Sequence, residues 1–501
     1  MKPLFKDRIC AVIAAKTAVE AVQQVRLAHR LTRTIEIRLD WLRNAHERDA
    51  FFESGVRVFP EWTIATCRSI AAGGRFRGSA HAQTWVLNAA ALAGCWKRDY
   101  EIENIGPGSW ALYYPGGKVR DHRRGVIVSY HNFRQTPAQL KSIVRRLLAP
   151  EGSAIKIAMQ CHFIRDSLRL LALCKRQPDV IAVPMGEIGL PARVLALKHG
   201  SALAYASVGE KTAPGQLTLD EMKNLYRADK LDKHTRVYGV IGNPVSHSLS
   251  PLLHNTGFIA KRMNDVYLPF LVRGLRDFLA AIKPLGIRGF SVTVPWKEKI
   301  LRHLDDCDPL AAAIGAVNTV VVRKNGQLYG MNTDYVGVLR ALQERVRLRG
   351  ARVLIYGAGG VARAVAFALA HEGAVPAICA RRPSQARQLA RAVRCESLDR
   401  RALRTEYFDA IVNCTPVGMH PRVTESPLRA DELNCRLVFD TVYRPERTKL
   451  LQLAARRRIE TISGVEMFLA QGIAQWEIWT EQRAPEKQMR AAIMTALRDG
   501  K

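Results

Sequence analysis

Eight short runs of apolar and β-branched residues recur between residues 9 and 209, and they constrain the fold more than any other feature of the chain. The runs are ICAVIA, TIEIRLD, TIATCR, YEIEN, GVIVSYH, AIKIAMQ, VIAVPMG and LAYASVG. Most intervening segments are long enough for a helix, and residues 17–31 show apolar side chains at helical spacing. Strands alternating with helices eight times over roughly 200 residues predict a (β/α)8 barrel.

Polar side chains gather where these expected strands end, which is where such barrels carry their chemistry. Lys156 lies between two isoleucines, so we expect it to be desolvated, and desolvation favours the neutral amine that attacks a carbonyl. His131, one strand away, has a side chain suited to proton transfer near neutral pH. Taken alone, Lys156 also fits a salt-bridged lysine and His131 a core histidine with satisfied hydrogen bonds. The two together on neighbouring strands favour a catalytic pair.

Residues 8–228 resemble the type I 3-dehydroquinate dehydratases through EIRLD, ATCR followed by GG, SYHNF followed by TP, KIA, MGEIGLPAR and TAPGQ. The resemblance implies that Lys156 forms an imine with the substrate ketone and that His131 removes the C2 proton and assists the loss of water. One departure is Ala72, which precedes the GG pair where members of the family carry a glutamate that orients the histidine. The resemblance also implies that the substrate is held by Glu36, Arg38, Arg68, Arg193, Thr212 and Gln216, and arginine is suited to a bidentate grip on a carboxylate.

A second unit begins at RVYGVIGNP, after a stretch at residues 218–235 that is expected to form a polar amphipathic helix and a short link. In RVLIYGAGGVARAVAFALA an apolar strand meets a glycine-rich turn and then a helix, the arrangement that binds a pyrophosphate. About twenty residues later, Arg381 and Arg382 stand where an NAD-binding unit offers an acid, which favours NADP. The alternatives are an ordinary tight turn and a solvated arginine pair. The cofactor residues predicted in this segment are Gly357, Ala358, Gly359, Gly360, Val361, Arg381 and Arg382.

Residues 236–490 resemble shikimate dehydrogenase through SHSLSP, SVTVPWKEK, GAVNTV, NTDYVGV, NCTPVGMHP, DTVYRP and GVEMFLAQG, in that order. The resemblance implies a catalytic dyad of Lys297 and Asp334. A lysine beside a developing alkoxide stabilises its charge, and a carboxylate orients the lysine. Taken alone, Lys297 fits a surface lysine and Asp334 a helix N-cap. The resemblance further implies that Ser246, Ser248, Thr293, Asn318, Tyr443 and Gln471 surround the substrate ring, and that Thr415, Pro416, Val417 and Gly464 border the nicotinamide.

Length and composition set the remaining expectations. The 501 residues predict two to four domains, with bounds expected at 1–230 for the barrel, 236–345 completed by 463–501 for a substrate domain, and 346–462 for a Rossmann domain. Net charge is +31, but the basic residues are spread along the chain, so a specific nucleic-acid partner is not expected. Ten scattered cysteines without a C-x-x-C pair predict reduced thiols and no metal site. Without a long apolar run or a signal segment, we expect no membrane partner and a cytoplasmic location; the oligomeric state stays open.

The sequence thus predicts an α/β chain with two active sites that convert 3-dehydroquinate to 3-dehydroshikimate and then, with NADPH, to shikimate. The nearest alternative is a quinate/shikimate dehydrogenase whose barrel is impaired at Ala72. More distant alternatives are a basic nucleic-acid-binding or scaffold protein with relic enzyme halves, and a barrel that acts as a Schiff-base aldolase.

Overall fold

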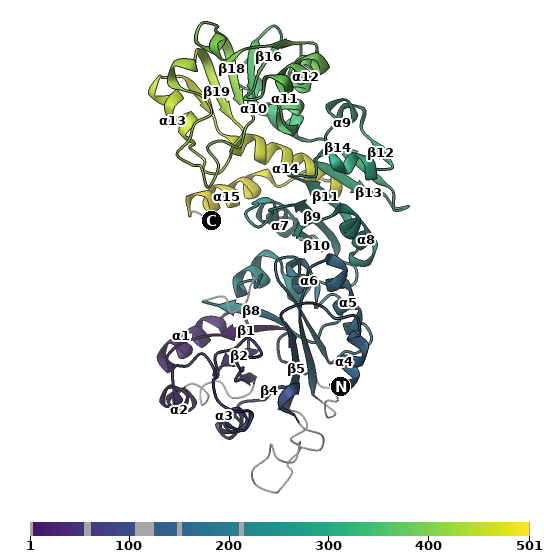
Figure 1. Cartoon of the computed structure of the whole chain (residues 1–501), viewed down its shortest axis with the longest axis vertical. Helices are drawn as coiled ribbons and strands as arrows, with labels where there is room; N and C mark the ends of the chain where they lie inside the picture. The colour runs from purple at the N-terminus through teal and green to yellow at the C-terminus, as the bar shows by residue number, and fades with distance from the viewer. Residues whose placement is uncertain (1–3, 55–61, 106–124, 148–152, 210–214, 500–501) are drawn as a thin grey trace. The chain divides into compact units, whose positions relative to one another are not determined.

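The computed structural model describes residues 4–54, 62–105, 125–147, 153–209 and 215–499 (Figure 1). Contacts divide the chain into two compact units, one of residues 1–236 and 269–286 and the other of residues 237–268 and 287–501. This division does not separate a substrate domain from a dinucleotide domain, so the domain bounds expected from the sequence stay predictions.

The first unit contains an eight-stranded parallel sheet in the order β7-β6-β5-β4-β3-β2-β1-β8, and β7 and β8 at its two ends also contact each other. The sheet therefore curls into a nearly closed barrel, which confirms the predicted fold class. Its strands are β1 (Ile9–Ile13), β2 (Ile35–Arg38), β3 (Thr63–Thr66), β4 (Lys97–Glu101), β5 (Val126–Asn132), β6 (Ala154–Gln160), β7 (Val180–Met185) and β8 (Ala204–Val208). The helices that alternate with them are α1 (Ala18–Ala28), α2 (Ala45–Ser54), α3 (Ala80–Leu92), α4 (Leu140–Arg146), α5 (Ile164–Cys174) and α6 (Leu190–Leu195).

Two elements of this unit differ from the prediction. The fourth strand begins at Lys97 instead of Tyr100, and Ile102–Asn104 forms a 3-10 turn. Where a helix and a short link were expected at residues 218–235, the helical stretch is short and contains a five-residue π-helical turn, Glu221–Leu225, and a 3-10 turn, Ala228–Lys230, follows it. Arg227 between the two turns has φ +49°, a left-handed conformation that interrupts a right-handed helix.

The second sheet has the order β10-β9-β11-β13-β14-β12, in which β9 and β11 are parallel and β13 is antiparallel to both β11 and β14. Its strands are β9 (Arg236–Gly242), β10 (Asp265–Leu271), β11 (Ile287–Val292), β12 (Asp306–Cys307), β13 (Thr319–Val322) and β14 (Leu328–Met331). The helices in this part of the chain are α7 (Ser250–Ala260), α8 (Leu275–Leu285), α9 (Pro309–Ile314) and α10 (Asp334–Gln343).

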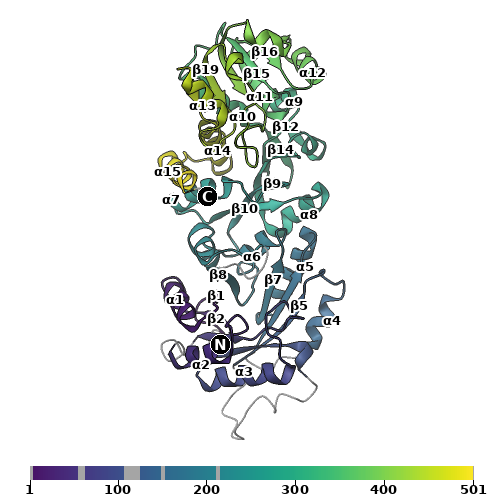
Figure 2. The same ribbon diagram turned by 60° about the vertical axis from the view of Figure 1, so that its left-hand side comes forward.

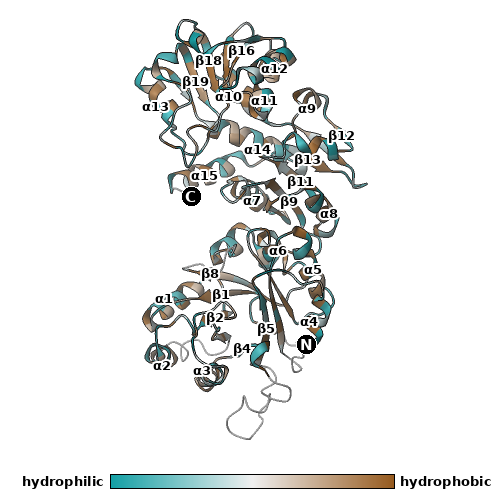
Figure 3. Ribbon diagram, viewed as in Figure 1, coloured by the Kyte–Doolittle hydropathy of each residue, from teal (hydrophilic) through white to brown (hydrophobic). Residues whose placement is uncertain are grey.

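The third sheet is parallel and has the order β17-β16-β15-β18-β19-β20, the strand order of a doubly wound dinucleotide-binding fold. Its apolar strands appear brown in Figure 3. One buried core joins one face of the sheet to α10, α11 and α12, and a separate core joins the other face to α13 (Figures 1 and 2). The elements are β15 (Arg352–Tyr356), β16 (Val375–Cys379), β17 (Glu396–Ser397), β18 (Phe408–Asn413), β19 (Cys435–Asp440), β20 (Glu460–Ile462), α11 (Gly360–His371), α12 (Pro383–Val393), α13 (Lys449–Arg456), α14 (Gly464–Thr480) and α15 (Glu486–Arg498).

Candidate active sites

A cavity of about 90 Å³ within the barrel brings together the residues predicted for the dehydratase site. Thr212 lies outside the described residues, so the structure says nothing of its position. Ala72 and Tyr205 border the same cavity, although neither was predicted to contact the substrate. The predicted residues that line it are Glu36, Arg38, Arg68, His131, Lys156, Arg193 and Gln216.

Lys156 on β6 points its amine at two carboxylates. Nζ lies 3.1 Å from Glu36 Oε1 on β2 and 3.1 Å from Asp99 Oδ2 on β4. It also lies 4.1 Å from the centre of the Tyr205 ring on β8. The side chain is buried as expected, but these contacts suit an ammonium ion more than the neutral amine that its apolar neighbours in the sequence indicated.

Asp99 is a residue of this site that the sequence analysis missed. Its carboxylate also lies 2.7 Å from Arg68 Nη2 and is completely buried. Burial opposes its ionisation, but the charges of Arg68 and Lys156 outweigh burial and hold the pKa of Asp99 well below its usual range. Nothing in the sequence indicated it, because KRDYE contains four charged residues and so does not show the apolar pattern of a strand.

His131 on β5 is a neutral base in this arrangement. Burial, and then the positive charges of Arg68 and Lys156, lower the pKa of His131 well below its ordinary value, whereas the sequence indicated proton transfer near neutral pH. Its ring stacks on Phe133, with centroids 6.0 Å apart and planes 17° from parallel. Among the described residues, none forms a hydrogen bond with its buried Nδ1. A histidine with this environment can accept a proton when a substrate brings one within reach.

Three guanidinium groups border the same cavity and are fixed by neighbouring oxygens. Arg38 makes a bidentate contact with Asp40, at 2.9 and 2.7 Å. Arg68 donates to Ser129 Oγ at 2.7 Å, and Arg193 donates from Nε to the backbone oxygen of residue 184 at 2.5 Å. Burial lowers the pKa of Arg193 to about 10, so it stays a cation at neutral pH. The cavity can therefore hold an anionic ligand beside an amine and a base.

The second unit contains the predicted pair of Lys297 and Asp334. Lys297 follows β11, Asp334 is the first residue of α10, and Nζ lies 2.6 Å from Asp334 Oδ2. The other carboxylate oxygen, Oδ1, accepts from Asn318 Nδ2 at 2.9 Å. Gln471 Oε1 is 3.5 Å from the same Asn318 nitrogen. Four of the predicted residues thus meet at one point, and Asp334 contacts a lysine and an amide in addition to beginning a helix.

The other residues predicted for the substrate ring lie on the loops that follow β9, β11 and β19. Ser246 is exposed, and Ser248 is half-buried and accepts from the backbone of residue 250 at 3.2 Å. Thr293 packs against Gly242 at the end of β9, where an added Cβ would lie 2.6 Å from its methyl group. Tyr443 stacks on Phe468 at 4.6 Å, and burial raises the pKa of its phenol.

The glycine-rich turn lies where the strand order of the third sheet reverses, between β15 and β18, which is where doubly wound folds bind ligands. Gly357 has φ +130°, a conformation that favours glycine, and an added Cβ would lie 3.2 Å from the backbone of Cys414. At Gly359, the N-cap of α11, an added Cβ would meet no atom within 4 Å, so the backbone is open to a ligand. Ala358, Gly360 and Val361 continue this turn into α11, and Thr415, Pro416 and Val417 follow β18.

The structure also shows where the other residues predicted to contact the cofactor lie. Arg381 and Arg382 follow β16 and are exposed, and Arg382 is the N-cap of α12. Gly464 begins α14 so close to the chain that follows β19 that an added Cβ would lie 2.6 Å from Thr441 O. Open backbone at a helix N-terminus and two exposed guanidinium groups fit a pyrophosphate and a further phosphate.

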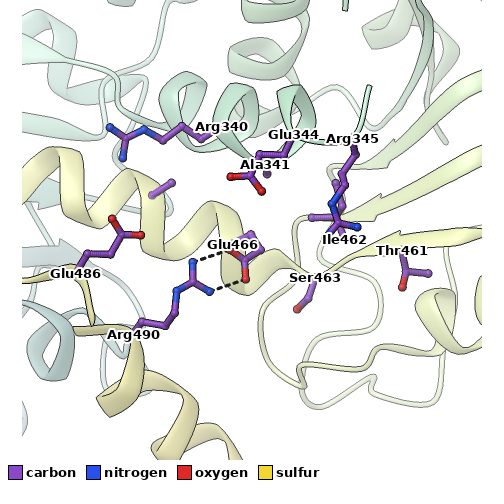
Figure 4. Close-up of a pocket in the computed structure, with 11 residues that line it drawn as sticks. Arg340, Ala341, Glu344, Arg345, Thr461, Ile462, Ser463, Glu466, Glu486 and Arg490 are labelled. Carbon is purple, nitrogen blue, oxygen red and sulfur yellow. Dashed lines mark hydrogen bonds and ion pairs between the residues drawn. The ribbon is translucent and has the colours of Figure 1, made fainter. Parts of the chain in front are cut away.

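Another cavity, of about 430 Å³, lies between α10, α14 and α15 and contains none of the predicted site residues (Figure 4). Three of its six charged side chains form ion pairs. Arg490 makes a bidentate contact with Glu466 at 2.7 and 2.8 Å, and Arg345 contacts Glu460 at 2.5 Å. In the described part of the chain, no helix is long and apolar enough to cross a membrane, and no group of His, Cys, Asp or Glu is arranged to hold a metal ion.

Comparison with known proteins covers both halves of the chain. The family profile of type I 3-dehydroquinase matches residues 9–233, and those of the shikimate dehydrogenase substrate-binding domain and the shikimate 5′-dehydrogenase C-terminal domain match residues 240–320 and 464–494. The chloroplastic bifunctional 3-dehydroquinate dehydratase/shikimate dehydrogenase of Arabidopsis thaliana is 35% identical, over 96% of this chain and 83% of its own. The NADP(+) shikimate dehydrogenase of Methanosarcina acetivorans is 42% identical, over 52% of this chain and 99% of its own. A crystal structure of shikimate dehydrogenase with NADP+ is 36% identical with a TM-score of 0.50, over 53% of this chain and 97% of its own.

A barrel with a lysine-centred cavity, followed by a Lys–Asp pair beside a doubly wound sheet, defines a two-site α/β enzyme. The match to the plant relative spans nearly the whole chain and includes both sites. The chain belongs to the family of bifunctional 3-dehydroquinate dehydratase/shikimate dehydrogenases.

Proposed function

We propose that the residues of the two sites carry out consecutive steps on one carbocycle. The chain is a bifunctional enzyme of the shikimate pathway, a lyase that dehydrates 3-dehydroquinate and an NADP-dependent oxidoreductase that interconverts 3-dehydroshikimate and shikimate. The observation that carries this conclusion is the alignment of 96% of the chain with a relative that is named for both activities. The product of the first reaction is the substrate of the second.

In the first site, Lys156 attacks the ketone of 3-dehydroquinate and forms an imine, with the ketone oxygen leaving as water. Its ammonium must first lose a proton, and the carboxylate of Glu36 at 3.1 Å is placed to accept it. His131, held neutral by its surroundings, then removes the C2 proton, and the protonated imine takes up the electron pair as an enamine. Expulsion of the hydroxyl group as water follows from the enamine, and hydrolysis of the imine then releases 3-dehydroshikimate and restores the free lysine. Arg38, Arg68 and Arg193, with Gln216 and Thr212, hold the substrate carboxylate and hydroxyl groups.

In the second site, Lys297 donates a proton to the oxygen of the ketone as that oxygen gains negative charge. Asp334, fixed by Asn318 at 2.9 Å, keeps the amine in position and orients a ring hydroxyl. Bound NADPH supplies the hydride. Gln471 lies beside Asn318 and completes the wall against the substrate ring, and Ser246, Ser248, Thr293 and Tyr443 hold the remaining substrate groups.

The residues around the third sheet fit NADP. The open backbone at Gly359 admits the pyrophosphate at the N-terminus of α11, and Gly464 with Thr415–Val417 borders the nicotinamide. Arg381 and Arg382 have no ion-pair partner among the residues that the structure describes, so both are available to a 2′-phosphate. We further propose that the chain works on small molecules in the cytoplasm, without a nucleic-acid or membrane partner.

A coupled assay tests this function. Purified chain given 3-dehydroquinate and NADPH should yield shikimate and consume one NADPH for each molecule formed. Lys156→Ala should stop the assay at 3-dehydroquinate, and added 3-dehydroshikimate should restore NADPH consumption. Lys297→Ala should accumulate 3-dehydroshikimate. Borohydride added with 3-dehydroquinate should leave a mass adduct on Lys156; loss of the adduct with full dehydratase rate would refute the imine.

A further inference from the structure

Buried hydrogen bonds continue from the Lys297–Asp334 pair into the interior of the second unit. Asn318, which donates to Asp334, itself accepts from Thr319: the distance from Thr319 Oγ1 to Asn318 Oδ1 is 2.7 Å. The side-chain nitrogen of Gln475 donates to Thr319 Oγ1 at 3.0 Å and to the backbone oxygen of Asn318 at 3.1 Å. The amide of Gln475, on α14, is therefore hydrogen-bonded to Asn318, which holds the carboxylate of Asp334, and to Thr319, which donates to Asn318.

The series extends beyond Gln475 to a second strand. Ser291 Oγ on β11 donates to Gln475 Oε1 at 2.7 Å, and the hydroxyl of Tyr267 lies 2.6 Å from Ser291 Oγ. Because the Ser291 proton is given to Gln475, Tyr267 is the donor in the last contact. Every donor in the series then points toward Asp334, an alignment in which successive hydrogen bonds polarise and strengthen one another. All members are at most 6% exposed: Tyr267, Ser291, Gln475, Thr319, Asn318 and Asp334.

No other kind of side chain could take the place of Gln475 in this series of hydrogen bonds. Its amide uses the nitrogen as a double donor toward residues 318 and 319 and the oxygen as an acceptor from Ser291. A carboxylate at the same place would turn an oxygen toward the backbone oxygen of Asn318, and an apolar side chain would leave two buried hydroxyl groups without their partner. We infer that Gln475 is a positioning residue of the reductase site, which fixes Asp334, and through it Lys297, by way of Asn318 and Thr319.

This inference rests on the proposed reductase function and deepens it. If Gln475 positions the pair, Gln475→Met should lower kcat for 3-dehydroshikimate reduction by about 10-fold or more, because small displacements of reacting groups cost rate more than affinity. KM for 3-dehydroshikimate and for NADPH should each change by less than about 3-fold. The dehydratase activity of the same chain should stay at the wild-type level and serves as an internal reference for enzyme concentration.

A matched pair at Thr319 keeps the test independent of whether Gln475→Met folds. Thr319→Ser retains the hydroxyl and should keep wild-type kcat, whereas Thr319→Val removes it at similar size and should lose about as much kcat as Gln475→Met. Thr480→Val is the control on the same helix. It removes a buried hydroxyl that donates to Trp476 O at 2.7 Å and should leave kcat unchanged.

The possible results distinguish failure of the role inferred for Gln475 from failure of the proposed reductase function. A wild-type chain that does not reduce 3-dehydroshikimate would overturn both. A wild-type chain that reduces it, with kcat in Gln475→Met and Thr319→Val within about 2-fold of wild type, would overturn the role of Gln475 alone. Equal losses in the serine and valine variants of residue 319, or a loss confined to KM, would also count against positioning.

Discussion

His254 should make the second unit lose stability in mild acid. The residue lies on α7 with no exposed surface, and its ring stacks on Tyr267 with centroids 4.2 Å apart. Burial lowers the pKa of His254 from 6.5 to about 3 in the folded chain. The unfolded chain therefore binds one more proton than the folded chain at pH values between these two, so the free energy of unfolding falls as the pH drops below about 6.5.

The size of the effect is set by the protonation of His254 in the unfolded chain. At pH 5 the unfolded histidine is roughly 1.5 pH units below its pKa, and each unit is worth about 1.36 kcal/mol, so this residue alone lowers the free energy of unfolding by about 2 kcal/mol relative to pH 7. The folded pKa lies well below pH 5, so a change of one unit in it alters the result little.

Urea unfolding at pH 5, 6 and 7, followed by tryptophan fluorescence, measures the effect, and Trp479 lies 5.3 Å from the His254 ring. His254→Phe keeps a ring against Tyr267 and cannot titrate, so its free energy of unfolding should depend on pH by about 2 kcal/mol less than that of wild type over this range. His371→Phe, at an exposed position on α11, is the control for loss of a histidine. Parallel pH curves for wild type and His254→Phe would refute the reasoning.

Three further predictions concern the two sites. Ala72→Glu should place a carboxylate beside His131, raise the pKa of that histidine, and move the acid limb of the dehydratase pH–rate profile to higher pH; an unmoved limb would show that residue 72 does not act on His131. Replacing Arg381 and Arg382 together by alanine should raise KM for NADPH by about 10-fold or more and leave KM for NADH nearly unchanged, and equal changes for both cofactors would exclude a 2′-phosphate contact. Asp99→Asn should leave Arg68 and Lys156 short of a buried counter-charge and lower the free energy of unfolding by about 3 kcal/mol in urea titrations; wild-type stability would contradict that pairing.

The barrel was predictable because seven of its strands fall, to within one residue, inside the short runs of apolar and β-branched residues, and alternation with helices leaves few folds for such a pattern. The fourth strand was placed three residues late. All five residues of KRDYE are buried although four of them are charged, and its two carboxylates form ion pairs inside the barrel: Asp99 with Arg68 and Lys156, and Glu101 with Arg68. Local hydrophobicity does not record such long-range pairing, and Asp99 was missed for that reason.

In the second unit, short motifs indicated the residues that meet at the Lys–Asp pair, since each motif carries its polar residue at a fixed place. The buried residues that continue the hydrogen bonds of this pair into the interior carried no such signal. Gln475 is one of two glutamines in a largely apolar helix, and Ser291 lies in the strand IRGFSV, so each resembles an ordinary core or surface residue until the fold places them 2.7 Å apart. Contacts between residues 184 positions apart depend on the packing of α14 against two strands, which periodicity does not determine.

The two lysines differ in a way that matches the two reactions proposed for them. Lys156 lies between two carboxylates, and one of them can take its proton when the amine must become a nucleophile. Lys297 contacts one oxygen of a single carboxylate, while Asn318 holds the other oxygen, so the amine is held in one position, as a proton donor to a substrate oxygen requires. Removing a carboxylate should therefore act differently at each site. Glu36→Gln should slow the formation of the borohydride-trapped adduct on Lys156, because the proton acceptor beside the amine is lost, whereas Asp334→Asn should lower kcat for ketone reduction with little change in KM, because the amine is no longer held in position. An unchanged rate of adduct formation in the first variant, or a loss confined to KM in the second, would show that the lysines had been given the wrong roles.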